Sequence, residues 1–250
     1  MKKMILLLAE LLCKFVDTKF SMVARYSFII LLFALCFSSC KKENESKPVD
    51  LKFSYFPLTL GHELIYKVTD ITIDDTMNIF DTIRYELKER IDSMFIDNSG
   101  NKAWRLERYE RSDSTQPWVI HDVWVTQIVH NQVQQIEENQ RYVKIVFPPE
   151  INKNWDGNIF NTLGTKTYEI SGVDQACSIN NFSFDSVLTV VEERDTSLIN
   201  KYFTFEQYAN HVGLINKEVI EISYARVEYH VPIEQRILRG HLYYQSLIHK

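Results

Sequence analysis

Residues 83–91 read IRYELKERI, and this stretch decides between a helical and an all-β interpretation of the chain. Ile83, Leu87 and Ile91 have the spacing of one helix face. Ile83, Tyr85 and Leu87, in contrast, alternate with charged side chains, as residues do on a strand with one buried face. Because the same alternation recurs on both sides of this stretch, we interpret it as a strand.

Period-two alternation continues towards both ends of the chain. Leu64, Tyr66 and Val68 share one face of an earlier segment, and residues 104–107 alternate in the same way. Residues 118–128, WVIHDVWVTQI, are apolar on both faces, which predicts a strand in the interior of a sheet. Further alternating segments lie at residues 142–147, 187–192, 200–209, 212–229 and 235–248.

Residues 53–250 contain no amphipathic helical pattern longer than about two turns and no linker rich in Pro, Gly or Ser. The sequence therefore predicts an all-β fold, in which residues 53–250 form one domain with a single antiparallel curled sheet or open half-barrel.

Two local features refine this prediction. The pair Pro148-Pro149 should end a strand, and the turn-forming residues that follow predict irregular structure across residues 150–182, with Trp155 at an edge of the core. Gly61 and Gly213 each precede a predicted strand, so we expect both to adopt positive φ angles at corners of the chain.

The net charge of −5 divides unequally along the chain. Residues 1–39 carry five basic and two acidic residues, whereas residues 40–250 carry 23 basic and 31 acidic residues, a balance of −8. Because nucleic-acid binding depends on basic side chains that neutralise phosphates, we expect no nucleic acid among the partners.

The N-terminal residues resemble a cleavable export signal. Arg25 precedes the apolar run FIILLFALCF at residues 28–37, which would span only about 15 Å as a helix and is too short to cross a bilayer. We therefore predict a signal peptide at residues 1–39, with translation starting either at Met1 or at Met22.

Residues 37–40, FSSC, resemble a bacterial lipobox, in which the Cys thiol receives a diacylglycerol before the signal is cut off. The resemblance implies lipidation of Cys40, a lipidated polar tether at residues 40–52 and attachment to a membrane. The alternative is an ordinary secretory signal with an incidental Cys. Beyond Cys40 only Cys177 remains, so we expect no internal disulfide in the mature chain.

Two segments resemble a group of uncharacterised lipoproteins from Bacteroidetes-type bacteria. The first is YFPLTLG at residues 55–61, and the second is YANHVGLINKE at residues 208–218. The group usually has a Trp near Leu64 and Ile65, and a smaller pair where this chain has Asn210-His211. The resemblance implies a β-rich body in the cell envelope, with the outer membrane as the expected location, and implies no particular activity.

The sequence contains no complete catalytic or metal-binding motif. His62-Glu63 begins like a zinc-protease motif, but the second His four residues on is missing, and the other His residues have no metal-ligand spacing. Paired carboxylates such as Glu137-Glu138 are common on acidic surfaces. We expect no metal and no cofactor.

Aromatic side chains suggest a different kind of site. Six of them could line an apolar groove on the concave face: Tyr66, Trp104, Trp118, Trp124, Phe203 and Phe205. The alternative is that they form an ordinary core. The sequence therefore favours a non-enzymatic binding or assembly role, with a hydrophobic moiety, a glycan or a partner protein as the bound species, and a hydrolase of surface polymers as the alternative.

Overall fold

The computed structural model describes residues 49–225 and 230–250. The predicted signal peptide, Cys40 and most of the predicted tether lie outside the described residues. Residues 50–250 form one compact unit. Among the described residues, no helix is both long enough and apolar enough to cross a membrane.

Twelve strands and three short 3-10 helices make up this unit. The strands are β1 (Glu63–Asp74), β2 (Ile79–Ile96), β3 (Lys102–Arg111), β4 (Val119–Val129), β5 (Gln132–Glu137), β6 (Gln140–Val146), β7 (Asn154–Asp156), β8 (Thr167–Ile179), β9 (Phe182–Thr196), β10 (Asn200–Ala209), β11 (Gly213–Tyr224) and β12 (Ile237–His249). The 3-10 helices are η1 (Phe53–Tyr55), η2 (Asp75–Met77) and η3 (Ile233–Gln235). The prediction of an all-β fold is confirmed.

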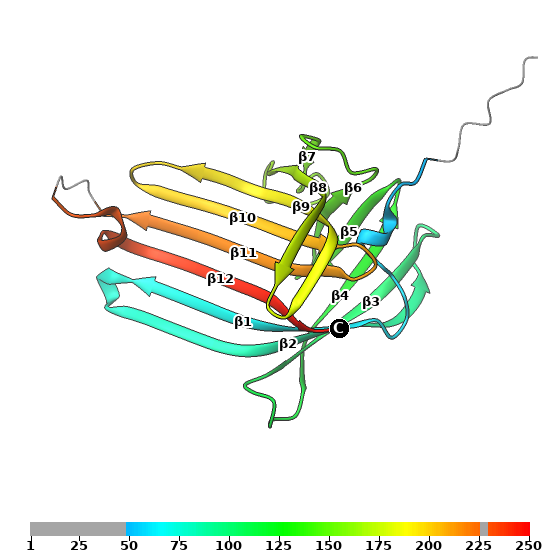
Figure 1. The fold of residues 1–250 in the computed structure, drawn as a ribbon, viewed down its shortest axis with the longest axis horizontal. Coiled ribbons are helices and arrows are strands. Elements are labelled where there is room, and N and C mark those ends of the chain that lie inside the picture. The colour runs from blue at the N-terminus through cyan, green and yellow to red at the C-terminus, as the bar shows by residue number, and fades with distance from the viewer. Residues whose placement is uncertain (1–48, 226–229) are drawn as a thin grey trace, which may run out of the picture. The chain divides into compact units, whose positions relative to one another are not determined.

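The strands form one antiparallel sheet in the order β6-β5-β4-β3-β2-β1-β12-β11-β10-β9-β8-β7. The chain therefore starts in the middle of the sheet, runs out to one edge at β6, and returns from the other edge at β7. Figure 1 shows the first strand, in cyan, beside the last strand, in red.

The two edges of the sheet approach each other, so the sheet is nearly closed around a seam. Across the seam the Val143 N–H of β6 donates to the Gly157 carbonyl at 2.9 Å, and Trp155 Nε1 of β7 donates to the Val143 carbonyl at 2.7 Å. Trp155 also packs against the core, as expected for a side chain at a core edge. The predicted curled sheet is thus present and is closed further than a half-barrel.

Local sequence explains how neighbouring strands are connected. Two-residue turns connect β4 to β5 and β5 to β6, and all four of their residues have positive φ: His130, Asn131, Glu138 and Asn139. This is the conformation of a hairpin turn that matches the twist of its strands. Residues 83–91 lie within β2, where Leu87 is fully buried beside Tyr66 of β1. The helical alternative for this stretch is therefore wrong.

The prediction of irregular structure for residues 150–182 is correct only for part of this range. Residues 157–166 contain no strand or helix, but the short strand β7 precedes them, and β8 begins at Thr167 and runs for 13 residues. Pairing in β8 shifts register three times, between Ile170 and Cys177, and Asp174 has a positive φ of 55°. These bulges break the regular alternation, which explains why the sequence pattern did not reveal the strand.

Two buried clusters stabilise the sheet. The first lies inside the curl and includes Tyr55 of η1, Ile145 of β6 and Tyr208 of β10. The second joins β1 to the β8–β9 hairpin through residues such as Tyr66 and Phe184. Gly61 and Gly213 have φ angles of +77° and +96°, which confirms the prediction that both form corners.

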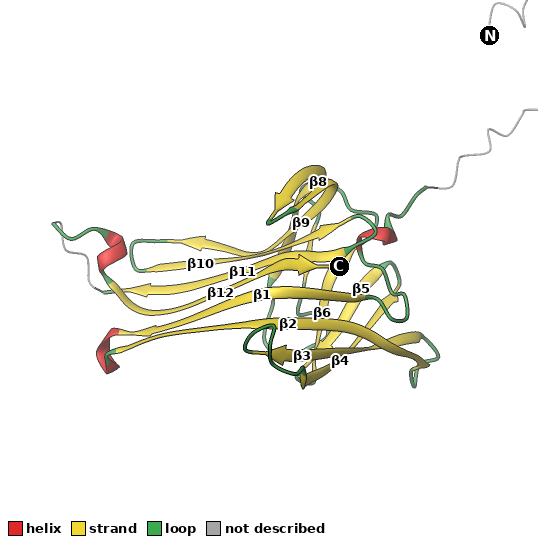
Figure 2. Ribbon diagram, turned by 60° about the horizontal axis from the view of Figure 1, so that its bottom comes forward, coloured by secondary structure: helices red, strands yellow, loops and turns green. Residues whose placement is uncertain are grey.

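The strands continue well beyond the curl on one side. In Figures 1 and 2 the ends of β1, β2 and β10 to β12 extend together to the left, away from β3 to β6. The curled part, and not this extension, holds the cavity described next.

Candidate functional site

A cavity of about 340 Å³ lies inside the curled part of the sheet. Side chains from β1 to β6 and from β10 to β12 line it, so the wall includes strands that are far apart in sheet order. Phe56, Pro57 and Val212 from the connecting segments also contribute, and His62 Nε2 is bonded to the Val212 carbonyl at 2.8 Å. This volume is within the range usual for small-molecule sites.

Strand alternation explains which side chains reach the cavity. In β3 the lining residues Leu106, Arg108 and Glu110 are two positions apart, and in β12 the same holds for Tyr243 and Gln245. Register places Leu106 beside Ile91 of β2 and Arg108 beside Glu89 of β2, and all four side chains line the cavity. The concave face is therefore rich in polar groups rather than purely apolar.

Arg108 is the centre of one ionic cluster in the wall. Its Nε donates to Glu89 Oε1 at 3.1 Å, and its Nη1 donates to Asp122 Oδ2 at 3.0 Å. The guanidinium carbon lies 3.8 Å from the ring centroid of Trp124, a cation–π contact. The Tyr66 hydroxyl is 3.0 Å from the Leu214 carbonyl, to which it donates, and 3.4 Å from Glu89 Oε2.

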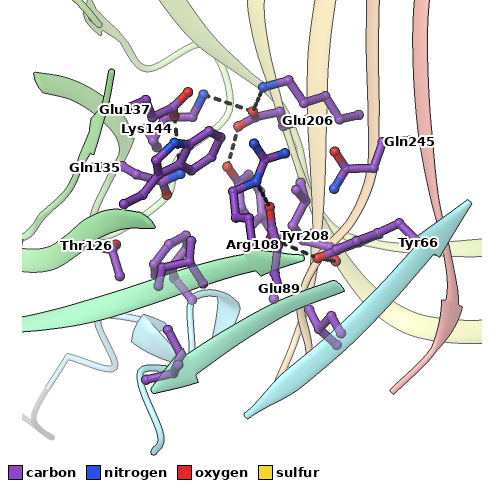
Figure 3. Close-up of a pocket in the computed structure, with 18 of the residues that line it drawn as sticks. Tyr66, Glu89, Arg108, Thr126, Gln135, Glu137, Lys144, Glu206, Tyr208 and Gln245 are labelled. Atoms are coloured by element: carbon purple, nitrogen blue, oxygen red, sulfur yellow. Dashed lines mark hydrogen bonds and ion pairs between the residues drawn. The ribbon is translucent and has the colours of Figure 1, made fainter. Parts of the chain in front are cut away.

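Lys144 is the centre of a second ionic cluster, which crosses from β6 to β9 and β10. Its Nζ lies 2.6 Å from Glu192 Oε1 and 2.9 Å from Glu206 Oε1, and Glu206 Oε1 also lies 3.0 Å from Lys217 Nζ. Tyr208 donates its hydroxyl to the other oxygen of Glu206. Figure 3 shows Lys144 and Glu206 facing each other across the cavity wall.

The pKa values of the two carboxyl groups in this cluster, Glu192 and Glu206, shift in opposite directions. Burial acts to raise the pKa of Glu206, but Lys144, Lys217 and the Tyr208 hydroxyl together outweigh it and lower the pKa below its usual value. Burial and the neighbouring Glu206 raise the pKa of Glu192. Burial lowers the pKa of Lys144, but both carboxylates outweigh it, so that the lysine stays charged. Glu206 is therefore a structural anion and a poor proton donor.

Glu89 is the lining carboxyl group whose proton affinity is increased. Burial raises its pKa, and Arg108 opposes the increase only in part. A raised pKa makes the Glu89 carboxyl group more ready to carry a proton than an ordinary exposed carboxyl group.

Three polar atoms of lining residues are buried without a hydrogen-bond partner among the described residues. They are Trp124 Nε1, Thr126 Oγ1 and Gln245 Nε2. The residues Thr126 and Gln245 are 0% and 2% exposed, so water from the bulk does not reach them freely. Unsatisfied buried polar groups are rare and costly, so each of these atoms calls for a partner that the described side chains do not supply.

Glu137 is a lining carboxylate that forms no ion pair within 4.0 Å among the described residues. Its one hydrogen bond is from Gln135 Nε2 at 3.2 Å, and no Lys, Arg or His nitrogen in the described part of the chain lies within 4.0 Å of it. Arg108, Lys144 and Lys217, in contrast, each have a carboxylate partner. The lining therefore contains a free acceptor but no free cation among these three.

The structure separates the six aromatic residues that the sequence grouped into one groove. Tyr66 and Trp124 line the cavity, whereas Trp104, Trp118, Phe203 and Phe205 do not. Phe203 and Phe205 alternate with the buried Thr204 and Glu206 and contact each other on the opposite face of β10. Trp118 instead stacks with Arg111, 4.1 Å from its guanidinium carbon.

Sequence reasoning missed the polar lining. The signal was present, because Gln135 and Glu137, or Tyr243 and Gln245, occupy alternate positions of single strands. Alternation shows that such residues share a face, but it does not show whether that face is solvent or a cavity.

Metal ligation and thiol chemistry find little support in the described residues. Residues 49–225 and 230–250 contain no group of three His, Cys, Asp or Glu side chains that could hold a metal ion. Cys177 is a free, half-buried cysteine that packs beside the second core cluster.

The hairpin ends of the extended part form a second exposed feature. Met77, Phe80 and Leu198 are 69%, 76% and 65% exposed. Acidic side chains such as Asp75 and Asp195 lie in the same hairpins, which disfavours contact with an anionic lipid surface.

No protein-family description matches the sequence, and no curated protein matches it either.

Proposed function

We propose that this chain is a lipid-anchored binding protein of the bacterial cell envelope, which holds a small organic ligand in the cavity inside its curled sheet. The observation that carries the binding role is the set of buried, unpartnered polar atoms in the wall of a 340 Å³ cavity. In a wall made only for stability, such atoms would be paired or replaced by apolar groups. The binding role is non-enzymatic and needs no cofactor.

Ligand retention tests the binding role directly. Full-length protein purified from a native-type bacterial membrane should release a small molecule when it is denatured, and mass spectrometry of the released fraction would detect it. Val219→Trp places a large ring in the cavity wall and should abolish the release, whereas Phe203→Leu on the opposite face should not. Equal release from both variants would contradict the proposal.

The anchor part of the proposal is supported by the lipobox-like residues before Cys40. Cys40→Ser removes the only thiol that can accept the diacylglycerol, so metabolic labelling with a radioactive fatty acid should mark the wild type and not the variant. Cys177→Ser serves as the matched control and should keep the label. Fractionation should place the wild type in the outer membrane. Equal labelling of wild type and Cys40→Ser would rule out the anchor.

A hydrolase of surface polymers is the second candidate, and one observation favours it. Glu89, whose pKa burial raises, and the unpaired Glu137 line the same cavity, and carboxyl groups in unequal environments are typical of glycoside hydrolysis. Both oxygens of Glu89 already have partners, which makes it a poorer acid. Release of reducing ends from envelope polysaccharide, lost in Glu137→Gln, would favour the hydrolase over the binding protein.

A further inference from the structure

We propose that the ligand of this cavity is a neutral, hydroxyl-rich molecule of the size of a mono- or disaccharide. This inference rests on the proposed binding function and adds the chemical class of the ligand. The wall leaves some hydrogen-bonding groups free, and classes of ligand differ in how well they match these groups.

An anionic ligand does not fit the charges of the wall. Arg108 is bonded to both Glu89 and Asp122, at 3.1 Å and 3.0 Å. Lys144 and Lys217 lie within 3.0 Å of buried carboxylate oxygens. A carboxylate or phosphate ligand would compete with these carboxylates for the same cations, and it would also lie near the negative charge of Glu137.

A cationic ligand fits only part of the wall. An ammonium group could pair with Glu137, but it offers no acceptor. Trp124 Nε1 is only a donor, and so is the Gln245 Nε2 amide, since the Tyr243 hydroxyl already donates to Gln245 Oε1 at 2.8 Å. Both donors would stay unsatisfied around a simple amine, which leaves their desolvation uncompensated.

Hydroxyl groups can pair with the free acceptor and with the free donors of the wall, because each hydroxyl can donate one hydrogen bond and accept others. A sugar hydroxyl can donate to Glu137, and its neighbours can accept from Trp124 and Gln245. Thr126 Oγ1, which can act in either role, lies on β4, one strand from Glu137 on β5. Figure 3 shows Thr126, Gln135 and Glu137 on one side of the cavity and Gln245 on the other, so a ligand between them can be held from two sides.

The aromatic side chains of the lining and the volume of the cavity are also consistent with a sugar ligand. Tyr66, Tyr85, Trp124 and Tyr243 line the cavity and provide flat apolar faces for the C–H groups of a sugar ring. A cavity of about 340 Å³ accepts about one or two such rings. An acyl chain would instead leave the free acceptor and the free donors unpaired.

Saturation-transfer NMR on the full chain tests the inference with defined probes. The sugar probes are glucose, galactose, mannose, N-acetylglucosamine and cellobiose, and the comparison probes are decanoate and spermidine. We expect saturable binding of at least one sugar. Thr126→Val should weaken its Kd about three- to tenfold, the effect of losing one neutral hydrogen bond. Thr204→Val, a buried threonine of β10 outside the lining, should leave the Kd unchanged.

A thermal unfolding scan without sugar separates loss of binding from loss of fold. Because Thr126 Oγ1 has no partner among the described residues, Thr126→Val should leave the unfolding temperature unchanged or raise it while it weakens binding. Trp124→Phe is a second variant, which keeps the aromatic ring and removes the free Nε1 donor, and it should weaken binding in the same way.

The possible outcomes distinguish the inference from the function on which it rests. Saturable binding of decanoate or spermidine without any sugar would overturn the sugar class and keep the binding function. Sugar binding that is equal in Thr126→Val, Trp124→Phe and Thr204→Val would place the sugar outside the cavity and would also overturn the inference. No binding of any probe, together with no released ligand from purified protein, would overturn both.

Discussion

At the scale of single residues, Lys144 is a buried cation held by two buried carboxylates. It is 4% exposed and lies between Glu192 and Glu206, which are 5% and 2% exposed. Such a triad need not stabilise the fold more than apolar side chains of the same shape would. Its members, however, depend on one another, because the loss of one leaves the others charged and buried.

Replacement of Lys144 should therefore be far more damaging than replacement of an exposed lysine in an ion pair. We expect Lys144→Met to lower the free energy of unfolding by about 3–5 kcal/mol, since two buried carboxylates lose their shared cation. Lys166→Met, which breaks the half-exposed pair with Glu193, should cost less than about 1 kcal/mol. Urea denaturation at pH 7 measures both, and equal costs would show that the triad is solvated.

At the scale of elements, η1 is joined to the β8–β9 hairpin by a small polar contact. The Tyr55 hydroxyl donates to Asp174 Oδ1 at 2.6 Å and lies 2.8 Å from Ser186 Oγ, while Lys52 Nζ pairs with Asp174 Oδ2. Tyr55 also belongs to the first core cluster, which lies against the inner cavity. The position of the segment that follows the predicted tether thus depends partly on one carboxylate.

The hydrogen bond from Lys52, followed by that from Tyr55, lowers the pKa of Asp174 from 3.8 to about 2. A lowered pKa stabilises the fold above the unfolded value, so this contribution is complete above about pH 4 and is lost as the pH falls towards 2. Because Asp174 is half exposed, solvent screening keeps the effect below about 1 kcal/mol.

Asp174→Asn should therefore lower the urea midpoint at pH 7 and make much less difference at pH 2.5. Asp185→Asn, an exposed carboxylate of β9, is the control and should change the midpoint little at either pH. A loss in Asp174→Asn that is the same at both pH values would show that the contact with η1 does not depend on the charge.

At the scale of the whole unit, β1 and β12 pair in the middle of the sheet although they are the first and last strands. The sheet is therefore complete only when the C-terminal strand has joined it. Contacts between strands far apart in sequence favour slow but cooperative folding. The seam between β6 and β7 is closed by the same side chains that pack the core.

Residues 50–250 should consequently unfold as one cooperative unit. A chain of this size can bury about 70% of the surface it exposes when unfolded, which is enough without disulfides. Circular dichroism should show a strand-dominated spectrum and a single thermal transition that coincides with the change in tryptophan fluorescence. Two separate transitions would indicate that the extended strand ends and the curled part fold independently.

The fold class followed from the sequence because alternation is a local property. Leu64, Tyr66 and Val68 recur at every second position, with Lys67 and Thr69 on the other face, and all three are buried in β1 as this pattern predicts. The corners at Gly61 and Gly213 were likewise predictable, because positive φ depends on the residue type at a turn. The strand β8 was missed because its bulges interrupt the alternation.

The cavity was decided only by the tertiary structure. The sequence separated Phe203 and Phe205 from Thr204 and Glu206, yet it could not show that Glu206 faces the cavity. That choice depends on which way the whole sheet curls, and the curl arises from twist, bulges and the approach of β6 to β7. The sequence alone thus determined the strands and their two faces, while the closed sheet determined which face encloses the charged and unpartnered groups of the site.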